Sequence, residues 1–171
     1  MDDDASVSHE ALFNQTLDAI MELEQLGFTC VESRETFRDR LEIFPDGVIV
    51  RPQVGYITSE IWRPGEQTFA LDHRIRDMHD TRGTTLYISS MVVHPSQRGK
   101  GMGQQFMTAL MRKVKDKYSH VNLVKLIVNA QWVHAHAIYV RLGFVEVDRL
   151  IGFFSDGDAI VMTRSMLSLP E

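Results

Sequence analysis

Three glycines and two cations lie within the six positions 98–103, which read RGKGMG. An apolar, β-branched segment precedes them and an amphipathic pattern follows, so the sequence predicts a turn that joins a strand to a helix. The first N–H groups of a helix have no intrahelical acceptor and attract phosphate, and glycines remove Cβ atoms that would block its approach. Two interpretations follow: a turn that only redirects the chain, or a cradle for an anion.

Two common nucleotide-binding motifs do not fit this spacing. A Walker loop requires Gly-Lys-Ser/Thr, whereas Lys100 is followed by Gly101. A dinucleotide fold requires G-x-G-x-x-G and an acidic residue about 20 positions further on. Here the spacing is G-x-G-x-G, and the next predicted strand ends in Asn129 and Ala130. Nucleoside-triphosphate hydrolysis is disfavoured, and a nucleotide-binding oxidoreductase stays only as a minor alternative.

Hydrophobic periodicity predicts the elements that position this turn. Helices are expected over 15–26, 33–44, 102–117 and 134–143, with a further short helix within 69–79. Strands are expected over 47–50, 54–62, 85–93 and 122–130, followed by a C-terminal hairpin of 144–154 and 158–167. The long connection 63–84 is of a kind that often carries function. This order of elements predicts a mixed α/β domain.

Composition excludes several classes of protein. A chain of 171 residues is one domain by default, and its net charge of −5 argues against a general nucleic-acid binder. A single cysteine, Cys30, forms no intrachain disulfide. Residues 1–10 are acidic and predict a flexible N-terminus, and no apolar run of about 18 residues is present to span a membrane. His134 and His136 point to different sides of a helix, so no metal site is expected. We expect a soluble cytoplasmic protein.

The glycine turn resembles the phosphate-binding signature of the GNAT superfamily of N-acetyltransferases. That signature is Arg or Gln, two residues, Gly, one residue, and Gly or Ala, and Arg98, Gly101 and Gly103 match it. Val93 and Pro95 stand where the family carries the apolar end of a strand and a V-x-P. The match is therefore made in the expected context of strand, turn and helix.

A second family element follows downstream. Residues 126–128, Tyr139 and Gly143-Phe144 match the family's strand, its helical tyrosine and its Gly-Phe. The resemblance covers roughly residues 15–165 and implies a single N-acetyltransferase domain over 1–171. The implied fold class is α/β (α+β), with a mixed central sheet of about six to seven strands flanked by helices, a splayed central strand and a C-terminal β-hairpin.

The resemblance implies acetyl-coenzyme A as the donor and no metal. Free backbone groups on the splayed strand pair with the pantetheine arm in this family, and by position these belong to Met91, Val92 and Val93. The pyrophosphate lies on the glycine turn, with these residues: Arg98, Gly99, Lys100, Gly101, Met102, Gly103 and Gln104. Transfer runs directly from the thioester to an amine. A non-catalytic acyl-CoA-binding module is the alternative.

The chemistry requires a proton donor for the thiolate, because an unperturbed thiol has a pKa of about 8.5. Tyr139 matches the acid of the family, and the alternative is an aromatic packing residue whose hydroxyl is satisfied elsewhere.

The general base stays open. Tyr87 and Ser89 stand where arylalkylamine N-acetyltransferases carry two histidines, and neither is an obvious base. Deprotonation runs through water, or through Glu60, His73 or Asp72, and the sequence does not choose.

One departure from the family lies near the tyrosine. Many relatives place an asparagine seven residues before it that bonds the cofactor arm, and this chain has Trp132. Asn129, at the end of the strand, either replaces that contact or caps a turn.

Two patterns give conflicting indications of the acceptor. The segment 60–95 resembles the arylalkylamine branch, which predicts a small primary amine in an aromatic and acidic pocket drawn from Trp62, Phe69, Glu60 and Asp72. The hairpin instead resembles those of peptide and ribosomal-protein N-terminal acetyltransferases, which would need a groove near Phe153 and Phe154. We favour the small amine, with a peptide N-terminus or a protein lysine as the alternative. A monomer and a homodimer both fit.

Overall fold

The apolar segments of the sequence form one six-stranded sheet in the computed structural model, which describes residues 3–28, 30–65, 69–71 and 73–167, with side chains from Ser8 onward. The strands are β1 (Val48–Arg51), β2 (Gly55–Trp62), β3 (Thr85–Val93), β4 (Leu123–Asn129), β5 (Val145–Phe154) and β6 (Gly157–Ser165). Their order is β1-β2-β3-β4-β6-β5; β3 and β4 pair in parallel, and the other neighbours are antiparallel. The predicted mixed sheet and C-terminal hairpin are confirmed.

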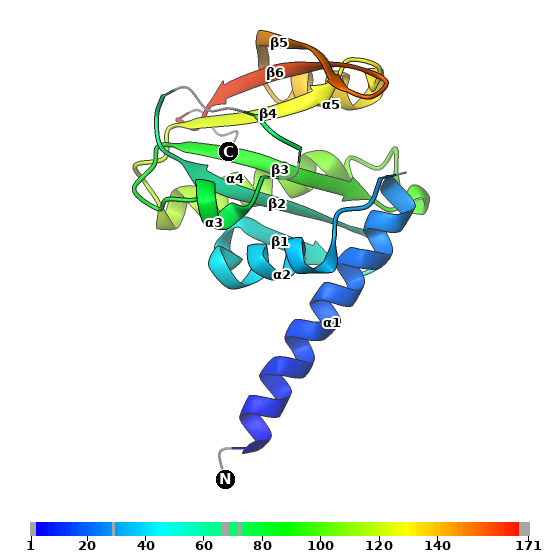
Figure 1. Ribbon diagram of the computed structural model, residues 1–171, viewed down its shortest axis with the longest axis vertical. Coiled ribbons are helices and arrows are strands. Elements are labelled where there is room, and N and C mark those ends of the chain that lie inside the picture. The colour runs from blue at the N-terminus through cyan, green and yellow to red at the C-terminus, as the bar shows by residue number, and fades with distance from the viewer. Residues whose placement is uncertain (1–2, 29, 66–68, 72, 168–171) are drawn as a thin grey trace.

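Helices cover both faces of the sheet (Figure 1). They are α1 (Asp3–Gly27), α2 (Arg34–Ile43), α3 (Ile75–Met78), α4 (Met102–Lys117) and α5 (Val133–Arg141), with short 3-10 turns η1 (Pro45–Gly47) and η2 (Pro95–Gln97). On β2, Tyr56 packs with Leu17 and Phe37 of α1 and α2. The next residue, Ile57, packs in the main core with Leu110 of α4. Successive side chains of a strand point to opposite faces, so α1 and α2 lie on one face and α4 on the other.

Helix α1 is longer than the periodicity predicts. It begins at Asp3 and includes residues 3–10, where the sequence predicts a flexible segment, and Figure 1 shows it projecting beyond the sheet. Its C-terminal half is anchored through Leu17, Ile20 and Leu23, which are buried. The first turns lack the apolar stripe on which a sequence-based prediction depends, but they contain no proline or glycine to stop a helix.

Two irregularities in the middle of the sheet define the splay. The parallel pairing of β3 with β4 is limited to three residues of each strand and ends at Tyr87 and Lys125, although both strands continue beyond it. On the other side of β3, Thr58 pairs with Ser90 and the adjacent Ser59 pairs with Ile88. Ser89 is therefore the extra residue of a β-bulge, located where β3 leaves β4. The predicted splayed central strand is confirmed.

Candidate active site

The glycine turn between β3 and α4 has an open, left-handed backbone. Gly99 and Gly101 both have a φ of 75°, and a Cβ atom added at either would meet nothing within 4 Å. Residues with a Cβ are strained in this region of backbone space. The two positions therefore require glycine for their conformation, and they leave space beside the backbone in which an anion fits.

Helix α4 begins directly after this turn and presents unbonded N–H groups. Its first intrahelical bond is donated by Gln105 N to Gly101 O at 3.1 Å. Gly101 provides no side-chain cap, and the first turn carries no acidic residue. The N–H groups of Met102, Gly103 and Gln104 consequently have no intrahelical acceptor. With the helix dipole behind them, they form a terminus suited to phosphate.

The two cations of the turn lie at its rim. Arg98 Nε donates to the carbonyl oxygen of Val93 at 3.2 Å, which ties the turn to the end of β3. Lys100 Nζ lies 3.5 Å from Gln97 Oε1, and its side chain is exposed. Both positive charges remain beside the helix terminus, where they add to its attraction for an anion.

The end of β3 leads from the splay to this turn. Residues 91–93 pair with residues 55–57 of β2 along one edge, and no described strand pairs with their other edge. Gly103 is close to the same strand, because a Cβ atom added there would lie 3.6 Å from Met91 Cε. Among the described residues, two stretches of backbone therefore have groups without a strand or helix partner, one edge of residues 91–93 at the splay and the start of α4. They lie on either side of η2, whose own N–H groups are bonded locally, and Val93 O accepts from Arg98.

Tyr139 lies on α5 and packs against the main core. Its ring meets Phe144 edge to face at 5.9 Å between centroids. Burial raises the pKa of Tyr139 to about 12, and its hydroxyl has no hydrogen-bond partner among the described residues. A phenol that keeps its proton at neutral pH and has no fixed acceptor is suited to donate that proton.

Asn129 does not replace the missing asparagine of the family. Its Oδ1 accepts a hydrogen bond from Gln131 N at 3.0 Å, and its Nδ2 donates to Asp156 Oδ1 at 2.8 Å. Both ends of the amide are used to fix the turn after β4 and the tip of the β5–β6 hairpin. Asn129 thus caps a turn, which is one of the two roles that the sequence leaves open.

Trp132 joins two segments that flank the splay. Its ring lies 5.9 Å from that of Phe28, which follows α1, and 6.3 Å from that of Phe154, at the end of β5. We call these three residues the aromatic bridge. The end of α1 lies against β3, since a Cβ atom added at Gly27 would be 2.7 Å from Val92. The aromatic bridge therefore connects the end of α1, on the β3 side of the splay, to the β5–β6 hairpin, which pairs with β4 on the other side.

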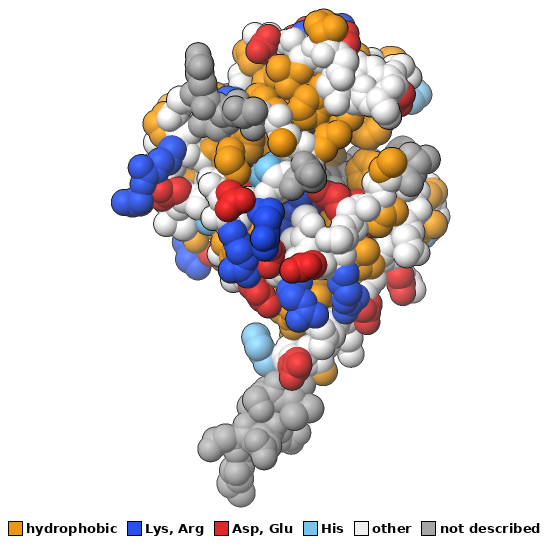
Figure 2. Space-filling view, viewed as in Figure 1, with side chains coloured by type: hydrophobic (Ala, Val, Ile, Leu, Met, Phe, Trp, Pro, Cys, Tyr) orange, Lys and Arg blue, Asp and Glu red, His pale blue; other side chains and the backbone are white. Residues whose placement is uncertain are grey.

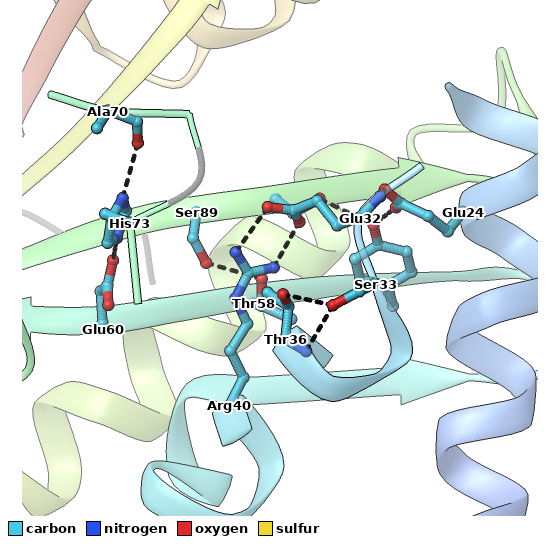
Figure 3. A network of polar contacts seen from close by, with 12 residues as sticks. Glu24, Glu32, Ser33, Thr36, Arg40, Thr58, Glu60, Ala70, His73 and Ser89 are labelled. Atoms are coloured by element: carbon cyan, nitrogen blue, oxygen red, sulfur yellow. Dashed lines mark hydrogen bonds and ion pairs between the residues drawn. The ribbon is translucent and has the colours of Figure 1, made fainter. Parts of the chain in front are cut away.

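The face of the sheet under α1 and α2 carries a buried network of polar contacts (Figure 3). Tyr56 Oη donates to Glu24 Oε2 and lies 2.8 Å from Ser90 Oγ. Two positions further along β2 and one position back along β3, Thr58 Oγ1 lies 2.8 Å from Ser89 Oγ. The bulge makes this arrangement possible, because it places two consecutive serines of β3 toward the same neighbouring strand.

A buried ion pair lies beside this network. Arg40 donates from both terminal nitrogens to the Glu32 carboxylate, at 2.7 and 3.0 Å, and its side chain is only 6% exposed. Glu32 N in turn donates to Glu24 Oε1 at 3.1 Å. Burial raises the pKa of the Glu24 carboxyl, although the hydrogen bond from Tyr56 opposes the shift.

The sequence analysis did not single out Glu24, Tyr56 or Ser90. One signal was available, because β2 is buried at every position and yet carries Tyr56, Thr58 and Glu60 on alternate residues. Polar side chains are not placed regularly along a buried strand unless they have partners.

Two of the predicted base candidates are paired with each other. His73 Nε2 hydrogen bonds to Glu60 Oε1, and its Nδ1 lies 2.9 Å from the carbonyl oxygen of Ala70. Burial lowers the pKa of His73, but the hydrogen bond and charge of Glu60 outweigh it and the pKa is raised. Both ring nitrogens face oxygen atoms, and the raised pKa favours the charged imidazole that donates to both, so His73 is poorly placed to accept a proton from an amine. Asp72 lies outside the described residues.

The predicted aromatic and acidic acceptor residues also come together. Trp62 stacks on Tyr87 with centroids 4.0 Å apart, and Phe69 lies 5.7 Å from Trp62, beside the Glu60–His73 pair. Trp62 is 1% exposed. The rings fill the space between them, so they form a packed wall at the closed end of the splay.

A family model for the acetyltransferase (GNAT) domain matches residues 63–154, which is more than half of the chain. The chain belongs to the GNAT acetyltransferase family. The match spans the glycine turn, the splay and Tyr139. No curated protein matches the chain in sequence.

Solved structures share the GNAT fold over most of their length. Ard1 from Thermoplasma volcanium is similar with a TM-score of 0.71 and 19% identity, over 90% of this chain and 93% of that one. The ribosomal-protein-S18-alanine N-acetyltransferase from Escherichia coli gives 0.62 and 19%, over 91% and 90%. Arabidopsis thaliana NAA60 in complex with acetyl-CoA gives 0.67 and 20%, over 90% and 95%. At these identities the likeness establishes the fold alone.

None of the helices in the described part of the chain is both long and apolar enough to cross a membrane. Within the same residues, no three histidine, cysteine, aspartate or glutamate side chains converge as they would around a metal ion.

Proposed function

We propose that this GNAT domain transfers the acetyl group of acetyl-coenzyme A directly to a primary amine. The observation that carries the proposal is a pair of backbone stretches with free groups, one at the end of β3 and one at the start of α4. Its first part, Met91, Val92 and Val93, offers an unpaired strand edge to the amides of a pantetheine arm. Its second part, from Gly99 to Gln104, offers N–H groups and two flanking cations to a pyrophosphate.

The donor fits the residues that are present. The space beside Gly99 and Gly101 would be narrowed by any side chain, and the start of α4 carries no acidic residue that would repel phosphate. NAA60, which shares the fold, is known in complex with acetyl-CoA. When bound, the cofactor supplies a thioester whose carbonyl carbon is open to attack by an amine.

Tyr139 is the proposed acid of the reaction. The amine forms a C–N bond to the carbonyl carbon while the C–S bond breaks, and the departing sulfur takes the proton of Tyr139. The phenolate regains a proton from the newly acylated nitrogen, so the residue returns to its starting state. The raised pKa of Tyr139, about 12, ensures that this proton is present before each turnover.

A small primary amine is the proposed acceptor. A peptide would need a groove beside Phe153 and Phe154, and the aromatic bridge links Phe154 to Phe28 through Trp132 at that place. The bridge narrows the approach between the two flanking segments, which favours a compact acceptor. A peptide N-terminus is the alternative, because structures with this fold include the S18-alanine N-acetyltransferase.

We also propose a cytoplasmic location and a monomer or homodimer. Figure 2 shows hydrophobic side chains gathered over the end of the molecule formed by β4, β5 and β6. Val145, Val147 and Ile151 of the edge strand β5 are more than half exposed there, which supports a homodimer through this strand. Light scattering at two protein concentrations distinguishes the two states.

The test is a screen for release of free thiol from acetyl-CoA in the presence of amines and short peptides. We expect release that depends on the added acceptor and a rise in Tm with acetyl-CoA. Stabilisation without turnover across the whole panel would indicate an acyl-CoA-binding module instead. Stabilisation by NAD but not by coenzyme A would indicate an oxidoreductase.

A further inference from the structure

We propose that Glu24 is the base that receives the proton of the acceptor ammonium, through the hydroxyls of Ser90 and Tyr56. This inference rests on the proposed acetyl transfer and supplies the base that it lacks. Glu24 and Tyr56 are 1% and 0% exposed, so neither touches the acceptor directly. Ser90 is partly exposed, so it is the member of the relay that the acceptor amine can reach.

The direction of the hydrogen bonds defines the relay. A carboxylate only accepts, so Tyr56 uses its single O–H to donate to Glu24. Tyr56 Oη then has only lone pairs for Ser90, so Ser90 donates to it across 2.8 Å. The lone pairs of Ser90 Oγ are available to an external donor. The series of hydrogen bonds thus ends at an oxygen atom that can accept a hydrogen bond from an N–H group of the amine.

The position of Ser90 matches the place where the reaction occurs. In the proposed complex the pantetheine arm pairs with residues 91–93 and runs from the glycine turn toward the bulge. Each residue of β3 advances about 3.3 Å, so the residue before Met91 adjoins the thioester end of the arm. An amine that attacks there lies beside the bulge and within reach of Ser90 Oγ.

The surroundings of Glu24 suit a base. Tyr56 on β2 and Glu32 N on the connection after α1 each donate to one of its oxygens. The charged groups that act on it are Glu32 and Arg40, which neutralise each other as an ion pair. Burial is the largest influence and raises its pKa, which brings it nearer to the range that is effective at neutral pH.

The protons balance as follows. The ammonium gives one proton to Ser90, which passes its own to Tyr56, which passes its own to Glu24. The neutral amine forms the C–N bond, the thiolate leaves with the proton of Tyr139, and the second amine proton restores Tyr139. Glu24 returns its proton to water through the same hydroxyls once the products have left. One proton is released for each acetyl group transferred.

Adjacent serines provide a matched control. Ser89 lies in the same bulge and bonds Thr58, but among the described residues no hydrogen bond joins this pair to a carboxylate. Glu24→Gln, Tyr56→Phe and Ser90→Ala each interrupt the relay, whereas Ser89→Ala removes a neighbouring hydroxyl of equal size. Glu24→Gln keeps the shape of the side chain, and its amide oxygen still accepts from Tyr56, but its amide nitrogen cannot accept from Glu32 N. The Tm of every variant is therefore measured beside its activity, and the alkoxyamine reaction below shows whether the active site is still formed.

The experiment measures kcat/KM for an alkylamine against pH at saturating acetyl-CoA. We expect the three relay variants to lose about 10²-fold or more, since general base catalysis contributes about 10²–10⁴-fold. The wild-type rate rises with pH through the titration of Glu24, and this limb should disappear in Glu24→Gln. Ser89→Ala should stay within about 3-fold of wild type.

A second acceptor isolates the proton step. An alkoxyamine is unprotonated at neutral pH, so its reaction should be nearly as fast in Glu24→Gln as in the wild type. Equal losses with both acceptors, or an unchanged pH profile in Glu24→Gln, would overturn the relay and leave acetyl transfer intact. If the wild type acetylated none of the acceptors, the result would instead contradict the proposed acetyl transfer.

Discussion

The proposed donor side and acceptor side of the molecule use different chemical groups, backbone on one side and side chains on the other. The proposed donor side, within residues 91–104, relies mainly on backbone groups that are close together in the sequence. The proposed acceptor side uses side chains from α1, α2, β2 and β3, and Tyr56 lies 32 positions from Glu24 and 34 from Ser90. Backbone binding leaves a readable trace in glycine spacing. Side chains that meet only after folding leave at most a weak trace, such as the alternate polar residues of β2.

The comparison predicts that variants on each side change different kinetic constants. Donor-side changes should raise the KM for acetyl-CoA, and acceptor-side changes should alter the dependence on the amine. Tyr139, which acts on the leaving sulfur between the two sides, should change kcat alone.

Tyr139→Phe should give the largest effect of the direct tests. Loss of the proton donor should lower kcat by about 10²–10⁴-fold. The Tm and its increase with acetyl-CoA should be nearly unchanged, because the hydroxyl has no partner among the described residues. A kcat within a factor of about two of wild type would show that Tyr139 is only a packing residue.

Gly101→Val should weaken the donor side. The side chain enters the space beside the turn and strains a backbone whose φ is 75°. Hydrogen bonds to charged groups contribute about 1.5–3 kcal/mol each, so we expect the KM for acetyl-CoA to rise about 10- to 100-fold. The KM for the amine should not change.

Gly152→Val is the matched control, because Gly152 also has a positive φ, 65°, and open space beside it. It lies on the hairpin, away from the glycine turn. Both variants should lose about 1–2 kcal/mol of stability from backbone strain. An equal rise in KM for both would mean that strain, and not a lost anion site, explains the effect.

Trp132→Asn should change which acceptors the protein prefers. Opening the aromatic bridge should raise the ratio of kcat/KM for a short peptide over that for a small amine by about 10-fold, or about 1.4 kcal/mol. Stability should fall by about 1–3 kcal/mol, because two ring contacts are lost. Val133→Asn, an exposed neighbour outside the bridge, is the control. An unchanged ratio would show that the aromatic bridge does not limit the size of the acceptor.

Asp39→Asn should have the smallest effect. Asp39 accepts a hydrogen bond from Arg76 at 2.9 Å, and this lowers the pKa of its carboxyl below the usual value for an aspartate. The folded pKa lies below the unfolded one, so the ion pair stabilises the fold above about pH 4 and its contribution disappears as the pH falls through the folded pKa.

Because Arg76 is half exposed, the difference in unfolding free energy at pH 7 should be no more than about 1 kcal/mol. Urea unfolding at pH 7 and at pH 3 measures it. Asp18→Asn, which removes a more exposed ion pair with Arg34, should have less effect. A difference that grows on acidification would contradict the assignment.

The sequence predicts the strands, the helices and the glycine turn because each depends on short-range patterns, whereas the splay is expected only from the resemblance to the GNAT superfamily. The apolar stripe of α4 at Phe106, Leu110 and Val114 is buried as its period predicts. The expected helix within 69–79 is reduced to α3, Ile75–Met78. His73, just before it, is held by Glu60 instead of by helical bonds. A contact from β2 overrides the local preference there.

The candidate site divides in the same way. The residues proposed to hold the donor can be selected from the sequence, and their roles stay predictions. Glu60 and His73 come together, but as an ion pair that occupies both nitrogens of the imidazole. Glu24 belongs to a helix whose periodicity gives no reason to single out a carboxylate, and its importance emerges only from the hydrogen bond to Tyr56.

The most direct measurement of the central claim is acceptor-dependent acetyl transfer by the purified protein. Thiol release and the mass of the acceptor would be followed together, with acetyl-CoA as the only acyl source. The account predicts one thiol released for each acetylated amine and no release without an amine. Binding of acetyl-CoA, seen as a higher Tm, with no acetylated product from any amine or peptide would contradict it.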